Sequence, residues 1–166
     1  MNLSYMLRER AAQGMPVRIV QVGAGKFGTM HLAQARLTTG MHMVALADPM
    51  PDRARSRMIE VGWPAEQTAA KSIGDALKSG ATCVTDNAMS LMECPEIDVI
   101  VEATGDPATG IKLCLAAIEH GKHIVMVNVE ADSVAGPLLA QKARAAGVVY
   151  SLAWGDQPAL VCEHVD

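Results

Sequence analysis

The stretch VRIVQVGAGKFG, residues 17–28, decides the fold of this chain. It begins as a largely apolar, β-branched run, breaks into Gly-x-Gly-x-x-Gly and continues with the spacing of a helix. In such a unit Gly23 permits the tight turn, Gly25 lets a pyrophosphate approach the backbone, and Gly28 lets the helix pack close to the strand. The phosphates would then lie at the N-terminus of a helix. The stretch therefore predicts a dinucleotide-binding site.

The next strand end bears on which dinucleotide binds. The apolar run Met43–Ala47 ends at Asp48, 20 residues after Gly28, where a carboxylate would accept hydrogen bonds from a ribose. Its charge would repel a 2′-phosphate and so favours NAD. Beyond the turn stand Arg53, Arg55 and Arg57. Arg53 and Arg57 share a helix face and suit a phosphate, although a solvated basic face is the alternative. NAD and NADP both remain open.

Strand and helix patterns alternate along the whole chain. We expect strands at 17–22, 41–47, 82–85, 97–102, 123–127 and 148–150, and helices at 1–13, 26–37, 52–60, 72–78, around 111–118 and at 132–146. This alternation predicts right-handed βαβ crossovers, hence an α/β fold with helices on both faces of a parallel sheet. The expected fold is a doubly wound Rossmann sheet of order 3-2-1-4-5-6, which binds its ligand at the carboxyl ends of strands one and four.

Composition excludes several classes of protein. The 166 residues suffice for one domain with a sizeable core, which must be aliphatic because only 3% of residues are aromatic. A net charge of −4 without a basic patch argues against nucleic-acid binding. No apolar run suits a membrane span, no secretory signal is present, and the four cysteines lack Cys-x-x-Cys spacing. We therefore expect a cytoplasmic protein with free thiols and no metal site.

The residues after strands four and five complete the predicted site. Thr104 and its neighbours would pass beside the cofactor through their backbone, and Asn128 would face the nicotinamide ribose or the substrate. Glu102 would either meet the nicotinamide side or cap the turn, and Lys26 would either lie near the pyrophosphate or be solvated. The predicted cofactor-binding residues are Gly23, Ala24, Gly25, Lys26, Phe27, Gly28, Asp48, Arg53, Ala103, Thr104, Gly105 and Asn128.

Several segments give the chain a resemblance to a known family. The glycine motif, IDVIVEATG at 97–105 and HGKHIVMVN at 120–128 resemble the NAD(P)-binding domain of homoserine dehydrogenases. NVEAD at 128–132 and GDQP at 155–158 are similar in particular to their relatives with a C-terminal SAF domain, which include the deoxyxylulose phosphate reductoisomerase-like (DRL) oxidoreductases. The resemblance implies NAD(P) as cofactor and hydride transfer to or from a small polar substrate.

The chain departs from the family's pattern in two ways. Val129 stands where homoserine dehydrogenases carry a lysine directly after the asparagine, so the resemblance does not carry homoserine over as the substrate. The family also has a catalytic domain after the nucleotide domain. The residue pattern predicts a helical extension at 1–15. The resemblance implies an NAD(P)-binding domain at 16–150 and, at 151–166, the start of a substrate domain that the chain lacks.

These departures leave the catalytic residues unassigned. The chain is expected to be one part of a larger oxidoreductase and to be inactive by itself. The alternative is a dinucleotide-sensing or regulatory module without turnover. We also expect a homo-oligomer, because a nucleotide domain without its partner would expose apolar surface. The expected patch comprises Met126, Val149, Leu152 and Trp154.

Overall fold

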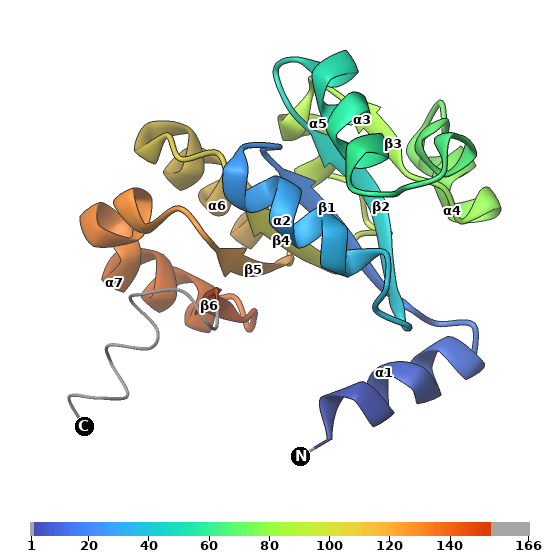
Figure 1. Ribbon diagram of the computed structural model, residues 1–166. Coiled ribbons are helices and arrows are strands. Elements are labelled where there is room, and N and C mark those ends of the chain that lie inside the picture. The colour runs from blue at the N-terminus through green and yellow to red at the C-terminus, as the bar shows by residue number, and fades with distance from the viewer. Residues whose placement is uncertain (1, 154–166) are drawn as a thin grey trace.

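The computed structural model describes residues 2–153, in which one six-stranded sheet has the order β3-β2-β1-β4-β5-β6 (Figure 1). Every neighbouring pair of strands is parallel. This order confirms the predicted Rossmann fold. The strands are β1 (Val17–Val22), β2 (Met41–Ala47), β3 (Cys83–Thr85), β4 (Val99–Glu102), β5 (His123–Met126) and β6 (Tyr150–Leu152).

Helices cover both faces of the sheet, and each face has its own core. Leu32 and Met58, from two of the helices, pack with Ile19 on one face. Leu113 and Leu139, from two others, pack against the opposite face. The helices are α1 (Leu3–Ala12), α2 (Lys26–Ala35), α3 (Pro51–Glu60), α4 (Ile73–Ser79), α5 (Ala88–Met92), α6 (Pro107–Glu119) and α7 (Val129–Ala145), with a 3₁₀ turn at Ala65–Thr68. None among residues 2–153 is long and apolar enough to cross a membrane.

The centre of the sheet positions the candidate site. β1 pairs with β2 on one side and with β4 on the other. The chain leaves β1 towards α2, on one face, and leaves β4 towards α6, on the other. The two connecting loops therefore diverge at the carboxyl edge of the sheet. This divergence creates the crevice in which doubly wound folds bind ligands.

Several elements differ from the sequence-based predictions: β4 begins at Val99 rather than at residue 97, and α6 begins at Pro107 rather than near residue 111. α7 begins at Val129 rather than at residue 132, because the Asn128 side chain caps it by accepting a hydrogen bond from the Ala131 backbone. The last strand occupies Tyr150–Leu152 rather than 148–150, since it is Tyr150 that pairs with Ile124. The short helix α5 was not predicted, and the Asn87 side chain caps it in the same way.

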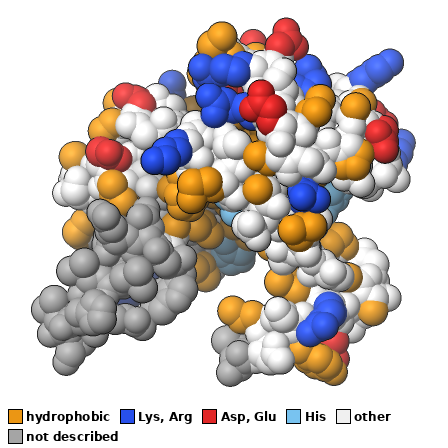
Figure 2. All heavy atoms as spheres, viewed as in Figure 1, with side chains coloured by type: hydrophobic (Ala, Val, Ile, Leu, Met, Phe, Trp, Pro, Cys, Tyr) orange, Lys and Arg blue, Asp and Glu red, His pale blue; other side chains and the backbone are white. Residues whose placement is uncertain are grey.

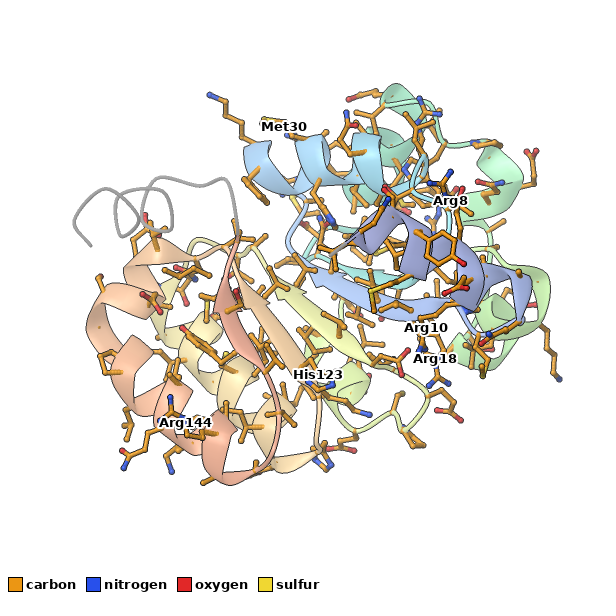
Figure 3. All side chains as sticks on the ribbon, turned by 90° about the horizontal axis from the view of Figure 1, so that it is seen from below. Arg8, Arg10, Arg18, Met30, His123 and Arg144 are labelled. Atoms are coloured by element: carbon orange, nitrogen blue, oxygen red, sulfur yellow. The ribbon has the colours of Figure 1, made fainter. Side chains whose placement is uncertain are left out.

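The predicted apolar patch does not form as expected. Met126 is fully buried, because it points into the core beneath α6 and α7. Val149 is exposed and Leu152 is partly buried, while Trp154 lies outside the described residues. Exposed apolar side chains occur instead on α1 and α2 (Figure 2). Met30, for example, points away from the sheet (Figure 3).

Candidate dinucleotide-binding site

Gly23 makes the turn out of β1, and two constraints require a glycine there. Its φ of +99° lies in the left-handed region, which L side chains rarely adopt. A Cβ on Gly23 would also overlap the backbone carbonyl of Ala103, in the loop after β4. The turn thus brings the β1 and β4 loops into direct backbone contact, as a site across both strand ends requires.

Gly25 and Gly28 have opposite surroundings. A Cβ on Gly28 would overlap the Gly23 carbonyl oxygen and lie 2.7 Å from the Gln21 amide nitrogen, so α2 packs closely against the turn. A Cβ on Gly25 would meet no atom within 4 Å. Gly25 is the N-cap of α2, and the first N–H groups of a helix have no partner within it. The open side of Gly25 therefore lies where a phosphate group would meet these donors.

A buried amide supports the glycine loop from below. Gln21 is fully buried in β1, and its Nε2 donates to the Gly23 carbonyl at 2.7 Å. Its Oε1 lies 2.7 Å from Nδ1 of His31 on α2, and burial lowers the pKa of that histidine. This pair was not predicted from the sequence. The available signal was a glutamine inside an otherwise apolar stretch, directly before the glycines.

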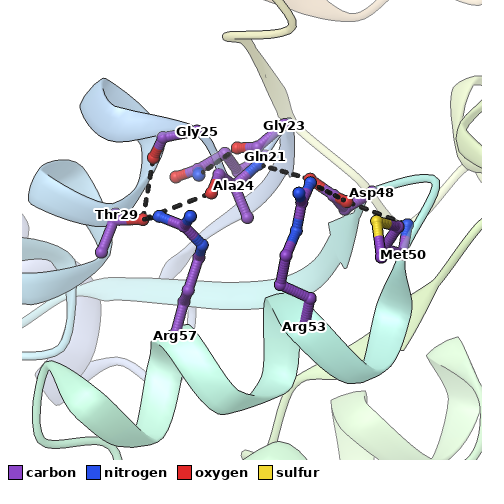
Figure 4. A network of polar contacts seen from close by, with 9 residues as sticks. All are labelled: Gln21, Gly23, Ala24, Gly25, Thr29, Asp48, Met50, Arg53 and Arg57. Atoms are coloured by element: carbon purple, nitrogen blue, oxygen red, sulfur yellow. Dashed lines mark hydrogen bonds and ion pairs between the residues drawn. The ribbon is translucent and has the colours of Figure 1, made fainter.

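Asp48 holds the glycine loop and the turn that follows β2. One carboxylate oxygen accepts a hydrogen bond from the Ala24 backbone at 2.9 Å, and the other accepts one from Met50, also at 2.9 Å (Figure 4). Arg53 lies 3.4 Å from the second oxygen, and the Asp48 side chain is only 4% exposed. The residue predicted to bind a ribose is thus also a structural anchor of the loop.

The three arginines of α3 separate into two groups. Arg53 and Arg57 both reach from α3 towards the glycine loop (Figure 4), and Arg57 donates to the Thr29 hydroxyl at 3.4 Å. Arg55 instead pairs with Asp52 at 3.1 Å and donates to a carbonyl of the 3₁₀ turn. The predicted shared face of Arg53 and Arg57 is present, and it points at the candidate site.

A pocket of about 240 Å³ opens between the β1 and β4 loops. Seven of the predicted cofactor-binding residues line it, together with Val127 and Glu130. Lys26 and Phe27 are exposed at its rim. The seven are Gly25, Lys26, Phe27, Ala103, Thr104, Gly105 and Asn128.

Asn128 ties the β4 loop to α7. Its Nδ2 donates to the Asp106 carbonyl at 2.9 Å and to the Thr104 hydroxyl at 3.3 Å. Its Oδ1 caps α7 through the Ala131 backbone. Asn128 is only 2% exposed. The amide expected to face a ribose or substrate is therefore directed into the protein, and it shapes the pocket wall.

Glu102 ends β4 and caps the turn that follows it. Its Oε1 accepts a hydrogen bond from the Thr104 backbone at 3.0 Å, and the side chain is 1% exposed. Of the two interpretations of Glu102, the structure supports turn capping. Burial raises the pKa of this carboxyl, against the opposing effect of its hydrogen bonds.

Parts of the chain are similar to known proteins. Residues 83–152, from β3 to β6, match the family described as the NAD-binding domain of homoserine dehydrogenase. The chain is 38% identical to a homoserine dehydrogenase from Pseudomonas aeruginosa over 99 residues, 60% of this chain and 22% of that protein. It is 30% identical to a 1-deoxy-D-xylulose 5-phosphate reductoisomerase from Mycolicibacterium smegmatis over 131 residues, 79% of this chain and 27% of that protein.

Solved structures agree on the fold. A homoserine dehydrogenase from Thiobacillus denitrificans superposes with a TM-score of 0.62 at 23% identity, over 80% of this chain and 28% of that one. An NAD-binding oxidoreductase from Klebsiella pneumoniae superposes with a TM-score of 0.59 at 23% identity, over 90% of this chain and 38% of that one. The chain spans about a quarter of the length of these curated relatives. Over residues 83–152 the chain is similar to the NAD-binding domain of homoserine dehydrogenase.

Proposed function

We propose that this chain binds NAD or NADP across the carboxyl ends of β1 and β4. One observation carries the proposal: Gly25, at the N-terminus of α2, has open space where a side chain would project. The pyrophosphate would occupy this space and accept hydrogen bonds from the first turn of α2. The nicotinamide would extend into the pocket between the two loops, beside Thr104 and Gly105.

Arg53 and Asp48 are the residues that would distinguish NAD from NADP. Asp48 suits the ribose hydroxyls of NAD, and Arg53 with Arg57 suits the 2′-phosphate of NADP. Because Arg53 already lies against Asp48, an incoming ribose would meet both groups at once. The proposal therefore covers both cofactors, with Arg53 as the side chain whose removal shifts the preference towards NAD.

For the whole protein we propose an oxidoreductase of the homoserine dehydrogenase-like or DRL-like kind, acting in the cytoplasm on a small polar substrate. The bound nicotinamide would supply the hydride chemistry, and this chain would bind and orient it. Val129 occupies the position of the family's lysine and begins α7, so a proton-transfer group would come from a domain beyond this one. Val149, exposed beside β6, remains a candidate contact in a homo-oligomer.

The matches to a homoserine dehydrogenase and to a 1-deoxy-D-xylulose 5-phosphate reductoisomerase support the homoserine dehydrogenase-like and the DRL-like interpretations alike, and Val129 argues against homoserine as the substrate. A dinucleotide-sensing module is the second candidate, and Val129 is the observation that favours it. Steady-state assays on the whole protein separate the two, since only the enzyme would turn over NADH or NADPH with a substrate.

Calorimetric titration with NADH and NADPH tests the proposed function. Wild type should bind at least one of them, and Gly25→Val should abolish binding while the domain stays folded, because the new side chain fills the phosphate position. Gly74→Val is the matched control, since Gly74 lies in the first turn of α4, near only the Ser72 side chain. Unchanged affinity in a folded Gly25→Val variant would overturn the assigned site.

A further inference from the structure

Glu102 carries a buried polar atom that nothing in the proposed site explains. Its Oε1 is bonded to the Thr104 backbone, but its Oε2 has no hydrogen-bond partner among residues 2–153. The absence of a side chain at Gly110 on α6 makes room for Oε2. A Cβ at Gly110 would lie 2.8 Å from Oε2 and 2.7 Å from the Asn128 amide nitrogen. A buried, unpaired carboxylate is costly, so the protonation state of Glu102 requires an explanation.

The groups around Glu102 offer no compensating positive charge. Asp106 at the N-cap of α6, Cys114 on α6 and Tyr150 on β6 lie near it, and Asp132 on α7 lies beside Tyr150. The Tyr150 hydroxyl donates to Asp132 at 2.6 Å, and burial raises the pKa of Cys114 to about 12. Within the described part of the chain no salt bridge reaches Glu102. None of these neighbours is positively charged. The nearby donors Thr104 and Asn128 favour the carboxylate, whereas burial, the largest effect, favours a neutral Glu102.

We propose that Glu102 is a neutral carboxylic acid at physiological pH. In this form it is the positioning residue of the loop 103–105, beside which the nicotinamide would lie. In the acid, Oε1 is the carbonyl oxygen that accepts the Thr104 N–H, and the proton resides on Oε2. This inference rests on the proposed function, because it concerns the same pocket. It adds a residue that touches no cofactor atom and acts through the backbone of Thr104.

Loss of that proton would disturb the site from beneath. An anionic Glu102 would draw water or cations between β4, α6 and α7, where Gly110 and Asn128 now fit closely. The loop 103–105, which forms one wall of the pocket, would then lose its fixed position. Cofactor binding should therefore favour the protonated form and weaken as pH rises through the pKa of Glu102.

The test compares the pH dependence of NADH and NADPH affinity in wild type and Glu102→Gln, measured by calorimetry. The glutamine keeps an acceptor for Thr104 and stays neutral at every pH. Wild-type affinity should fall by up to about tenfold per pH unit above the pKa of Glu102, while the variant keeps its low-pH affinity throughout. Glu119→Gln, which removes an exposed carboxylate at the end of α6, should follow wild type.

Each of the other possible results would contradict a different part of the proposal. Parallel pH profiles in wild type and Glu102→Gln, with binding intact, would overturn the neutral acid and leave the proposed function standing. Absence of binding to either cofactor at any pH would overturn the proposed function and the positioning role together. Glu102→Ala should weaken binding at every pH, since it frees the Thr104 N–H. Equal affinity in Glu102→Ala and Glu102→Gln would also count against the positioning role.

Discussion

The two loops that form the candidate site are built on different physical grounds. The β1 loop takes its shape from missing side chains: Gly23 and Gly28 remove atoms that would overlap the backbone. The β4 loop takes its shape from buried polar side chains, Glu102 and Asn128, which bond to its backbone. The first loop is therefore sensitive to added atoms, whereas the second is sensitive to charge and hydrogen bonding.

The largest expected effect comes from adding atoms to the β1 loop. Gly23→Val should lower the free energy of unfolding by about 3 kcal/mol or more, because it combines backbone strain with overlap against Ala103. Urea denaturation followed by circular dichroism measures it. Gly147→Val isolates the strain, since Gly147 has a φ of +72° but open space around it. Equal losses in the two variants would show that the contact with Ala103 does not matter.

Removing hydrogen bonds from the β4 loop should have a smaller effect. Asn128→Ala should cost about 2 kcal/mol of stability, through the lost cap of α7 and the lost hydrogen bonds from its buried amide to the Asp106 carbonyl and the Thr104 hydroxyl. Asn87→Ala provides the comparison, because Asn87 is exposed and makes the same cap, at 3.1 Å, at the start of α5. Urea denaturation of both variants should give the larger loss for Asn128, and the reverse order would contradict the role of the buried amide.

The charge sensitivity of the β4 loop predicts a pH-dependent difference in stability. Because burial raises the pKa of Glu102 above the ordinary 4.5, the native state holds its proton more tightly than the unfolded chain. That stability is complete below about pH 4.5 and is lost as pH rises to the native pKa. Relative to Glu102→Gln, wild type should therefore become less stable as pH increases above about 4.5. A constant difference would show that Glu102 titrates normally.

Outside both loops, Arg53 should affect cofactor choice with little effect on folding. Arg53→Ala should weaken NADPH binding by about tenfold, the value of one charge-assisted bond, and leave NADH binding unchanged or improved. Competition between the cofactors in a fluorescence titration measures the ratio. Arg55→Ala, whose side chain points to Asp52, should leave the ratio at the wild-type value. A shift of equal size in both variants would assign the effect to general charge.

Asp48→Ala is less informative for cofactor choice than the sequence suggested. Asp48 anchors the Ala24 backbone as well as standing at the ribose position. Its removal should therefore weaken NADH and NADPH together, because the glycine loop loses its support. Only a variant that spares the loop, such as Arg53→Ala, separates the two cofactors.

Local patterns predicted the fold and the β1 loop correctly for identifiable reasons. Strand order follows from the alternation of elements, and the glycines of the motif are visible because their function is the absence of a side chain. Gln21 and Glu102 could not be assigned in the same way, since their roles depend on partners distant in the chain, such as His31 and Gly110. The start of α7 was misplaced because Val129 and Glu130 show no helical periodicity of their own, and the cap at Asn128 determines it.

We propose that a dinucleotide lies across the ends of β1 and β4. Titration of the ¹⁵N-labelled chain with NADH and with NADPH, followed by amide chemical shifts, tests it most directly. The largest shifts should fall on Gly25, Lys26, Phe27, Thr104 and Gly105, with little change at the opposite edge of the sheet around Arg18 and His42. Absence of shifts with both cofactors, or shifts centred on that opposite edge, would contradict the claim.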